Sequence, residues 1–246
     1  EYDGAIKMAD EQFGRLITGL KKHHLYEKSI IILLSDHGES FDYFIGHGIE
    51  LRSDPQNHVI LAFKLPENNK HFEIGELVRT IDITPTVLDL IGLNINTLDF
   101  EGKSLKPLLF GGKLEGENYA LMETGFSLIG PGGVTLSFKK LISKGITFYE
   151  FNKKGIITVK ENLHMDLIRH KQRAIISKDW KLILEPNYKG ELKVFLYNLK
   201  TDPECKTNIA ANHPEITSKL LNELIKYYGG EISNIKFATN LIQGNL

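Results

Sequence analysis

The chain has 246 residues, 41% of them hydrophobic, with 30 basic residues against 31 acidic ones. This composition allows one large domain or two small ones, and the balanced charge argues against an electrostatic nucleic-acid binder or a membrane-surface protein. No apolar run approaches the roughly 20 residues that span a bilayer. The one cysteine, Cys205, excludes an internal disulfide, and its polar turn sequence predicts an incidental surface thiol.

The first predicted element is an amphipathic helix over residues 3–22. Its apolar residues recur at helical spacing; they are Ile6, Ala9, Phe13, Leu16, Ile17 and Leu20. Because this helix begins almost at Glu1, with no methionine or signal peptide before it, we expect the C-terminal part of a longer protein. The absence of a targeting segment then says nothing about location.

Two near-continuous apolar runs, 29–34 and 59–65, follow the helix and predict buried strands. Such runs are typical of parallel strands covered by helices on both faces. Thr84 and Pro85 predict the N-cap and first position of the next helix, which Gly92 ends.

Beyond about residue 115 the pattern changes to short β-rich pieces separated by turn-forming pairs, which indicates an antiparallel sheet. The pieces are 119–123, 146–151, 156–160, 173–177, 181–185 and 194–197. A final amphipathic helix is predicted from Pro214 to the pair Gly229-Gly230. The predicted class is therefore α/β, with a helix-covered sheet over 1–115 and a smaller antiparallel sheet plus C-terminal helix over 116–246.

Candidate site residues follow the first predicted strand. Asp36 and His37 come directly after it, and about ten residues later His47 lies between two glycines. Ligand sites in open α/β sheets gather beyond the carboxyl ends of the strands. A carboxylate and an imidazole placed there could bind a metal in a hydrolytic site, although a hydrogen-bonded turn explains an Asp-His pair equally well.

Several motifs follow one another in the chain: SDHGE (35–39), GHG (46–48), NHVILAFKLP (57–66), TIDITPTVLDLIG (80–92), EGKSL (101–105), RAIISKDWKLI (173–183) and LYNLKTDPECKTNIA (196–210). In this order they resemble the sulfatases, within the wider alkaline-phosphatase-like superfamily. Ile60 stands where this family usually has proline. The resemblance covers nearly the whole chain and is weakest over 125–170. It implies an alkaline-phosphatase-like sheet covered by helices, followed by the sulfatase-type C-terminal subdomain.

The resemblance also implies an enzyme, a metal-dependent sulfuric-ester hydrolase. Its nucleophile is a formylglycine made in a Cys/Ser-x-Pro-x-Arg motif, which this sequence lacks. The chain is therefore expected to carry only part of the active site, to be inactive alone, and to work with an N-terminal remainder of the same domain. Asp36 and His37 resemble the metal ligands. One divalent metal is expected, calcium by the tail motifs, or zinc or manganese in a phosphoryl-transferring relative.

Three more residues receive candidate roles. His47 resembles the histidine that contacts the ester and protonates the leaving oxygen; otherwise it is a structural loop residue. Arg52 stands where some members place a sulfate-binding lysine, and is otherwise a surface arginine. Glu39 could orient His37, or be a solvated acid. Lys181 is expected to be part of a tail strand.

Two other functions stay open from the sequence. One is a phosphodiesterase or a phosphoglycerol- or phosphoethanolamine-type transferase of the same superfamily; the other is a non-catalytic relative that binds anionic glycans. The expected substrate is a sulfated small molecule or glycan, with no nucleic-acid partner. Family resemblance favours a periplasmic or secreted location, and the Lys/Ile/Asn-rich composition favours a bacterial source.

Overall fold

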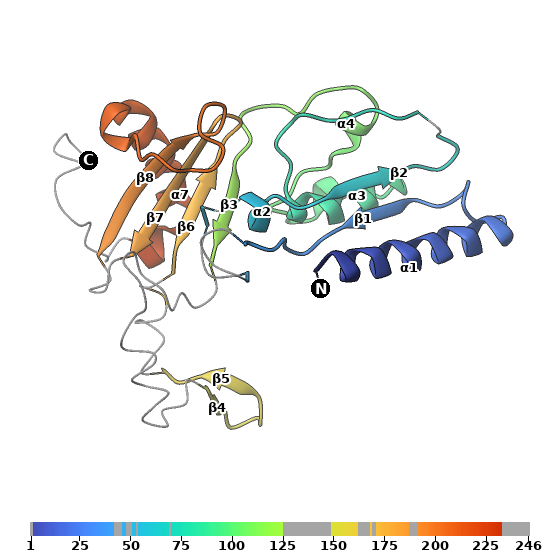
Figure 1. Cartoon of the computed structure of the whole chain (residues 1–246), viewed down its shortest axis with the longest axis horizontal. Helices are drawn as coiled ribbons and strands as arrows, with labels where there is room; N and C mark the ends of the chain where they lie inside the picture. The colour runs from blue at the N-terminus through green and yellow to red at the C-terminus, as the bar shows by residue number, and fades with distance from the viewer. Residues whose placement is uncertain are drawn as a thin grey trace. The chain divides into compact units, whose positions relative to one another are not determined.

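The computed structural model divides into two compact units, Glu1–Gly38 with His58–Glu73, and Glu39–Asn57 with Ile74–Leu246 (Figure 1). The residues it describes are 2–41, 46–47, 51–52, 54–68, 70–124, 149–161, 168, 171–186 and 191–232, the last four by backbone only. The predicted division near residue 115 is not where these two units separate; as a statement about domains it stays a prediction.

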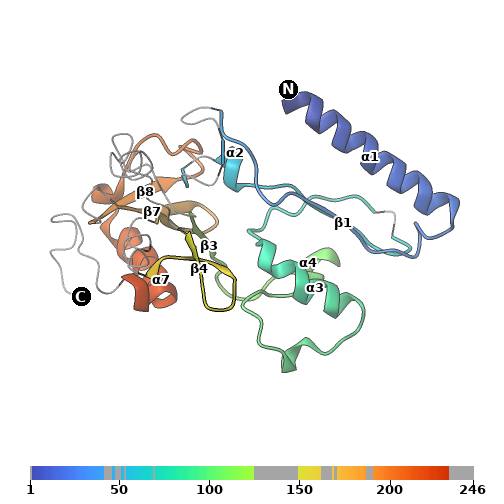
Figure 2. The same cartoon turned by 90° about the horizontal axis from the view of Figure 1, so that it is seen from below.

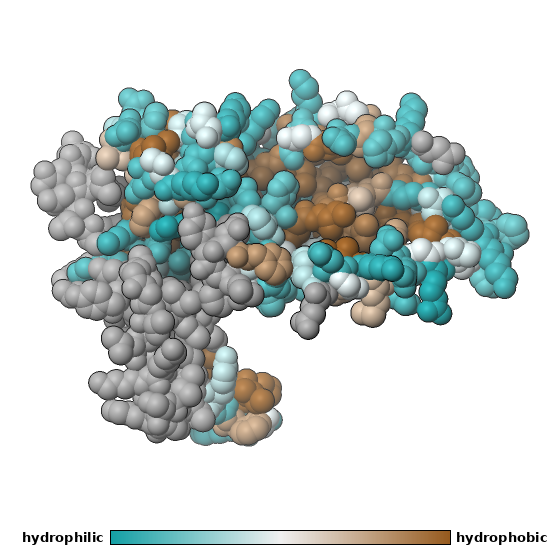
Figure 3. Space-filling view, viewed as in Figure 1, coloured by the Kyte–Doolittle hydropathy of each residue, from teal (hydrophilic) through white to brown (hydrophobic). Residues whose placement is uncertain are grey.

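The first unit contains α1 (Tyr2–Lys22), β1 (Ile31–Leu34) and β2 (Leu61–Lys64). The predicted first helix is confirmed, and Figure 2 shows it without a break. None of its side chains is buried. Apolar side chains also reach the surface over β1 and β2 in Figure 3, and Leu34 is 45% exposed.

The two strands of this unit pair antiparallel, with Ile31 opposite Lys64 and Leu34 opposite Leu61. The expected parallel pairing of these two strands is therefore wrong. No residue of β1 or β2 is buried, so the predicted burial of these strands is not seen either. A continuous apolar run favours a strand that other elements cover, but it specifies neither the covering elements nor the direction of the neighbouring strand.

In the second unit, the short helix α2 (Asp54–Asn57) precedes a helical region that starts with η1 (Thr80–Asp82) and α3 (Ile83–Leu90). Asp82 is the N-cap of α3, so the predicted N-cap at Thr84 is wrong. Pro85 lies within the first turn, where its missing N–H costs no helical hydrogen bond. Gly92 follows the helix with φ +83°, as its predicted end requires.

Two further short elements complete this region, η2 (Ile95–Thr97) and α4 (Lys106–Leu109). Leu105, Leu108 and Leu109 are buried there. No helix in the described part of the chain has both the length and the apolar character needed to cross a membrane.

The predicted antiparallel sheet is confirmed, with strand order β3-β6-β7-β8. Its strands are β3 (Ala120–Glu123), β6 (Arg173–Ile176), β7 (Trp180–Pro186) and β8 (Leu192–Asn198). A separate hairpin joins β4 (Tyr149–Phe151) to β5 (Ile157–Val159). Residues 146–148 of the predicted strand lie outside the described residues.

The turn η3 (Ala210–Asn212) leads into α7 (Pro214–Ile232), which packs across one face of the sheet (Figures 1 and 2). Leu220, Leu221 and Leu224 of this helix share a buried cluster with Leu184 and Leu196. The helix continues past its predicted end at Gly229-Gly230, because each glycine costs only about 1 kcal/mol in a helix interior.

The prediction of a surface thiol at Cys205 is wrong, because this residue is only 2% exposed. Its side chain packs in a second cluster with Leu51, Ala174 and Tyr197, on the sheet. The polar residues around it do form a turn, closed by the Asp202 carboxylate, which accepts from the Lys206 and Thr207 amides. Cys205 itself adopts φ +54° within that turn.

Candidate active site

The Asp-His pair lies at the end of β1 in the first unit. The Ser35 amide donates to the Ile60 carbonyl at 3.3 Å and extends the pairing with the neighbouring chain segment. Beyond this point the Asp36 carboxylate accepts from the His37 amide at 2.9 Å, and the Ser35 hydroxyl donates to the His37 carbonyl at 2.5 Å. Local hydrogen bonds therefore hold the two side chains at the strand end.

The ring of His37 is oriented by its own backbone. Its Nδ1 lies 2.9 Å from the Gly38 carbonyl, which can only accept, so Nδ1 donates to it and, in the neutral ring, Nε2 carries the lone pair. Nε2 is 3.6 Å from the Asp36 Oδ2. A hydrogen bond from one ring nitrogen to a carbonyl is the usual way in which proteins set a metal-binding histidine.

This donor set fits a divalent cation. One carboxylate oxygen and one imidazole nitrogen are close enough to reach the same ion, and both side chains are accessible, at 86% and 43% exposed. The described residues contain no cluster of three or more His, Cys, Asp or Glu residues suited to a metal. Asp36 and His37 could therefore supply two ligands, and the described part of the chain groups no third His, Cys, Asp or Glu with them.

His47 and Glu39 form a second pair, in the second unit. The Nδ1 of His47 lies 3.2 Å from one Glu39 carboxylate oxygen and 3.4 Å from the other. An isolated antiparallel bridge between Ser40 and Gly46 brings them together, with hydrogen bonds of 3.0 and 3.1 Å. Gly46 adopts φ +138°, which glycine reaches without strain. The bridge places the two residues that flank it side by side.

This pair gives Glu39 a partner that the sequence did not indicate. A carboxylate that accepts from Nδ1 fixes the tautomer and the ring orientation of His47, so that proton transfer would use Nε2. The role predicted for Glu39 toward His37 stays a prediction. The seven residues between Glu39 and His47 match no motif that predicts this pairing. Composition does not indicate a bridge between their neighbours.

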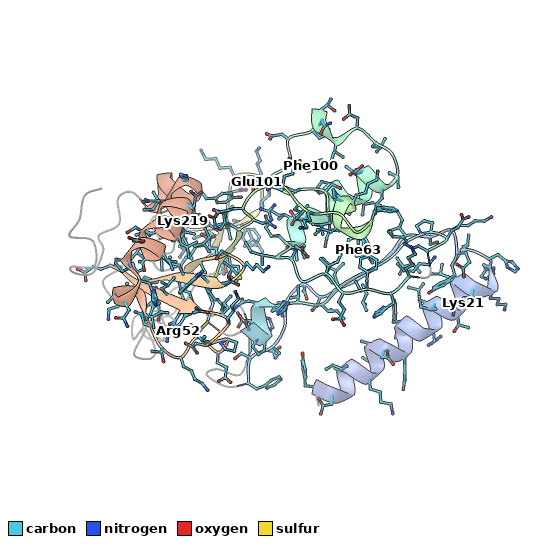
Figure 4. All side chains as sticks on the ribbon, turned by 90° about the horizontal axis from the view of Figure 1, so that it is seen from above. Lys21, Arg52, Phe63, Phe100, Glu101 and Lys219 are labelled. Carbon is cyan, nitrogen blue, oxygen red and sulfur yellow. The ribbon has the colours of Figure 1, made fainter. Side chains whose placement is uncertain are left out.

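Arg52 lies against the antiparallel sheet (Figure 4). Its Nη2 donates to the Glu185 carboxylate of β7 at 2.5 Å, and its guanidinium lies over the Phe195 ring of β8, 4.6 Å from the centroid. The arginine side chain is 31% exposed and the glutamate 6%. Arg52 is therefore held by a buried carboxylate and an aromatic ring while part of it stays accessible.

The backbone around Arg52 is fastened to the same sheet. The Leu51 amide donates to the Gln172 side chain at 2.9 Å, and the Leu51 side chain is 3% exposed. The Lys181 ammonium donates to the Arg52 carbonyl at 3.0 Å and to the Asp54 carboxylate at 3.1 Å. Lys181 lies in β7, as predicted, but its buried position and its partners were not foreseen.

Comparison with known proteins agrees with this architecture. A mixed α/β part with a metal-suited Asp-His pair after a strand, followed by an antiparallel sheet and a helix, is the arrangement of the alkaline-phosphatase-like class. Residues 1–93 match the family model described as Sulfatase, which supports the predicted resemblance of this chain to the sulfatases. The sulfatase family implies a divalent metal and a formylglycine nucleophile.

Individual relatives cover nearly all of this chain but only part of their own length. Arylsulfatase K of Rattus norvegicus is 26% identical over 224 residues, which are 91% of this chain and 34% of that protein. The chain thus spans about a third of the length of the curated relatives it matches.

Two solved structures show the same fold. The phosphonate monoester hydrolase of Agrobacterium radiobacter has a TM-score of 0.64 at 25% identity and covers 94% of this chain and 41% of its own. The structure of BT4656 in complex with its substrate D-glucosamine-2-N,6-O-disulfate has a TM-score of 0.58 at 21% identity. The match covers 93% of this chain and 40% of the BT4656 chain.

Proposed function

We propose that this chain carries part of the active site of a metal-dependent sulfatase, an enzyme that hydrolyses sulfuric esters. The observation that carries the proposal is the Asp36–His37 pair at the end of β1. A hydrogen bond from Nδ1 to the backbone leaves the Nε2 of the neutral His37 ring available to a metal. The pair lies inside the segment that matches the Sulfatase model. Both residues are accessible to a cation.

Each site residue then has a distinct role. Asp36 and His37 hold the metal, which when bound neutralises the anionic ester oxygens and activates the nucleophile. His47 donates a proton to the leaving oxygen from Nε2, while Glu39 holds its Nδ1. Arg52 contacts the anionic oxygens of the ester; its planar fork suits this geometry.

We propose calcium as the metal, because the tail motifs over 173–210 are those of sulfatases. A formylglycine would serve as nucleophile. The 246 residues contain no Cys/Ser-x-Pro-x-Arg motif, so it would come from outside them. The substrate would be a sulfated small molecule or glycan, and the enzyme would act in the periplasm or outside the cell.

A second candidate is supported by one comparison. The phosphonate monoester hydrolase matches this chain at 25% identity over most of its length, so phosphoryl chemistry on the same fold, with zinc or manganese, is the alternative function. The two functions differ in the central atom that is attacked, and the same assay can separate them.

The test uses the full-length protein from which this chain comes. Turnover of a chromogenic aryl sulfate and of a bis-aryl phosphodiester is measured before and after chelation, and again after calcium, zinc or manganese is added back. We expect aryl sulfate turnover that chelation removes and calcium restores. Asp36→Ala and His47→Ala should each lower kcat by about 10²- to 10⁴-fold.

The matched controls are Asp99→Ala and His71→Ala, which change exposed residues of the same two types. Both should keep parental activity. Phosphodiester turnover restored best by zinc or manganese would replace the sulfatase proposal by the second candidate. Absence of both activities together with absence of metal binding would contradict both.

A further inference from the structure

The charges around Arg52 are balanced by strand β7. Arg52 pairs with Glu185 at 2.5 Å, and Asp54, two residues along the chain, pairs with Lys181 at 3.1 Å. The four side chains carry two positive and two negative formal charges. Arg52 is therefore one half of an ion pair and not an isolated positive charge, although an arginine in the sequence suggests one.

The carboxylate of Glu185 is part of the scaffold rather than a mobile surface group. It is 6% exposed, and it lies on a strand paired on both sides, by β6 and by β8. The Phe195 ring supports the guanidinium from a neighbouring strand. Because Lys181 also holds the Arg52 backbone carbonyl, both ends of the arginine are positioned by the sheet.

A fixed negative charge beside an anion-binding arginine affects singly and doubly charged ligands differently. Coulomb energy scales with the product of the charges, so a second negative charge on the ligand doubles its repulsion from Glu185. Specificity between related ligands is often produced by such a repulsive element. A sulfate monoester carries one negative charge, whereas a phosphate monoester carries two near neutral pH.

We propose that Glu185 is a specificity-determining residue, which orients Arg52 and makes its site selective for singly charged ester groups over dianionic ones. This inference rests on the proposed contact between Arg52 and the substrate. It adds the substrate's charge class, monoanionic esters, to that proposal. Glu185 acts by orienting Arg52 and by the repulsion of its fixed charge; it contacts no reacting atom.

The test replaces Glu185 with glutamine in the full-length protein. E185Q keeps the size of the side chain and an oxygen that can accept from Arg52, but removes the charge. Calorimetry measures the binding of methyl sulfate, a monoanion, and of inorganic sulfate, a dianion, to the metal-loaded protein. The metal's own charge is the same in both proteins and cancels from the comparison.

We expect E185Q to improve the affinity for the dianion by about tenfold more than the affinity for the monoanion. The ratio of kcat/KM for an aryl phosphate to that for an aryl sulfate should rise by a similar factor. The matched control is Asp179→Asn. It removes a carboxylate that precedes β7 and pairs with Lys200 at 2.9 Å, and it should leave both ratios unchanged.

A purely structural ion pair would give a different result. In that case E185Q would lower the melting temperature and change both anion affinities by the same factor, which would overturn the proposal. An equal change in ratio for Asp179→Asn would also overturn it. If E185Q does not fold, Glu185→Asp retracts the charge by one methylene and should shift the ratio in the same direction by less; an unchanged ratio there contradicts the proposal.

The binding measurement separates this inference from the proposed function. A shifted anion ratio in a protein without sulfate-ester turnover would support the role of Glu185 and contradict the sulfatase activity. Sulfate-ester turnover with an unchanged anion ratio would support the sulfatase activity and contradict the role of Glu185. Failure of the parent protein to bind either anion would contradict the site at Arg52.

Discussion

The two long helices of this chain have similar sequence patterns and different environments. α1 has 21 residues and none of its side chains is buried, whereas α7 has 19 residues and buries Leu220, Leu221 and Leu224 against the sheet. Apolar residues recur at helical spacing in both. Periodicity therefore predicts that a segment is a helix and which face is apolar, but the surface that covers this face is decided elsewhere in the fold.

Other residues of one type also occur in both buried and exposed positions. Matched pairs of variants, one at a buried site and one at an exposed site, can test this contrast. The largest expected effect is in the helices themselves. Leu221→Ala in α7, at a site 1% exposed, should lower the free energy of unfolding by about 2–5 kcal/mol, since it leaves a cavity in a packed cluster.

The matched variant for this comparison is Leu16→Ala in α1, at a site 55% exposed, which should change the free energy of unfolding by no more than about 0.5 kcal/mol. Urea denaturation followed by circular dichroism measures both. Equal losses at the two sites would show that α1 is covered in solution, and the comparison between the helices would then fail.

Two glycines allow the same comparison between a crowded and an open position of the backbone. A Cβ atom at Gly102 would lie 2.1 Å from the Ile81 carbonyl oxygen, whereas one at Gly75 would meet nothing within 4 Å. Gly102→Ala should therefore destabilise the protein by about 1–3 kcal/mol, because backbone must move. Gly75→Ala should be close to neutral or slightly stabilising. Thermal denaturation of the two variants checks this, and similar melting temperatures would contradict the close approach at Gly102.

The smallest effect concerns an accessible ion pair and its pH dependence. Hydrogen bonds from Lys106 and Ser104 hold the pKa of Asp89 below its ordinary value. A lowered carboxyl pKa stabilises the fold above the unfolded-state pKa of about 4, and this contribution is lost as the pH falls through the folded-state value. With the Asp89 side chain 28% exposed, Asp89→Asn should cost less than about 1 kcal/mol at pH 7.

The measurement for Asp89 is urea denaturation at pH 7 and at pH 2–3. The difference between the parent protein and Asp89→Asn should shrink toward acid pH, and it should be smaller at pH 7 in a Lys106→Met background. A difference that stays constant with pH would mean that the Asp89 charge contributes nothing to stability.

The candidate site shows how far sequence reasoning reached. Asp36 and His37 were found because they are adjacent in the chain and follow an apolar strand. Their hydrogen bonds are local too, to each other and to Gly38. The pairing of Glu39 with His47 was missed, since it depends on a bridge between their neighbours.

The contacts that position Arg52 could not be predicted from the sequence. Gln172, Lys181 and Glu185 lie more than a hundred residues further along the chain. The strands predicted over 173–177 and 181–185 are present. Nothing in their sequence indicates which distant segment they contact. An arginine that the sequence presents as an anion contact is, in the structure, also one half of an ion pair.

By itself the sequence determined the local features of this protein: the helices α1 and α7, the strands, the antiparallel character of the second sheet and the Asp-His pair. Only the tertiary structure decided the antiparallel pairing of β1 with β2, the burial of Cys205 and the partner of Arg52. The physical reason is the range of the interactions. Helical period, turn residues and adjacent ligands act within a few residues, whereas strand direction, burial and charge pairing depend on segments that meet only after the chain has folded.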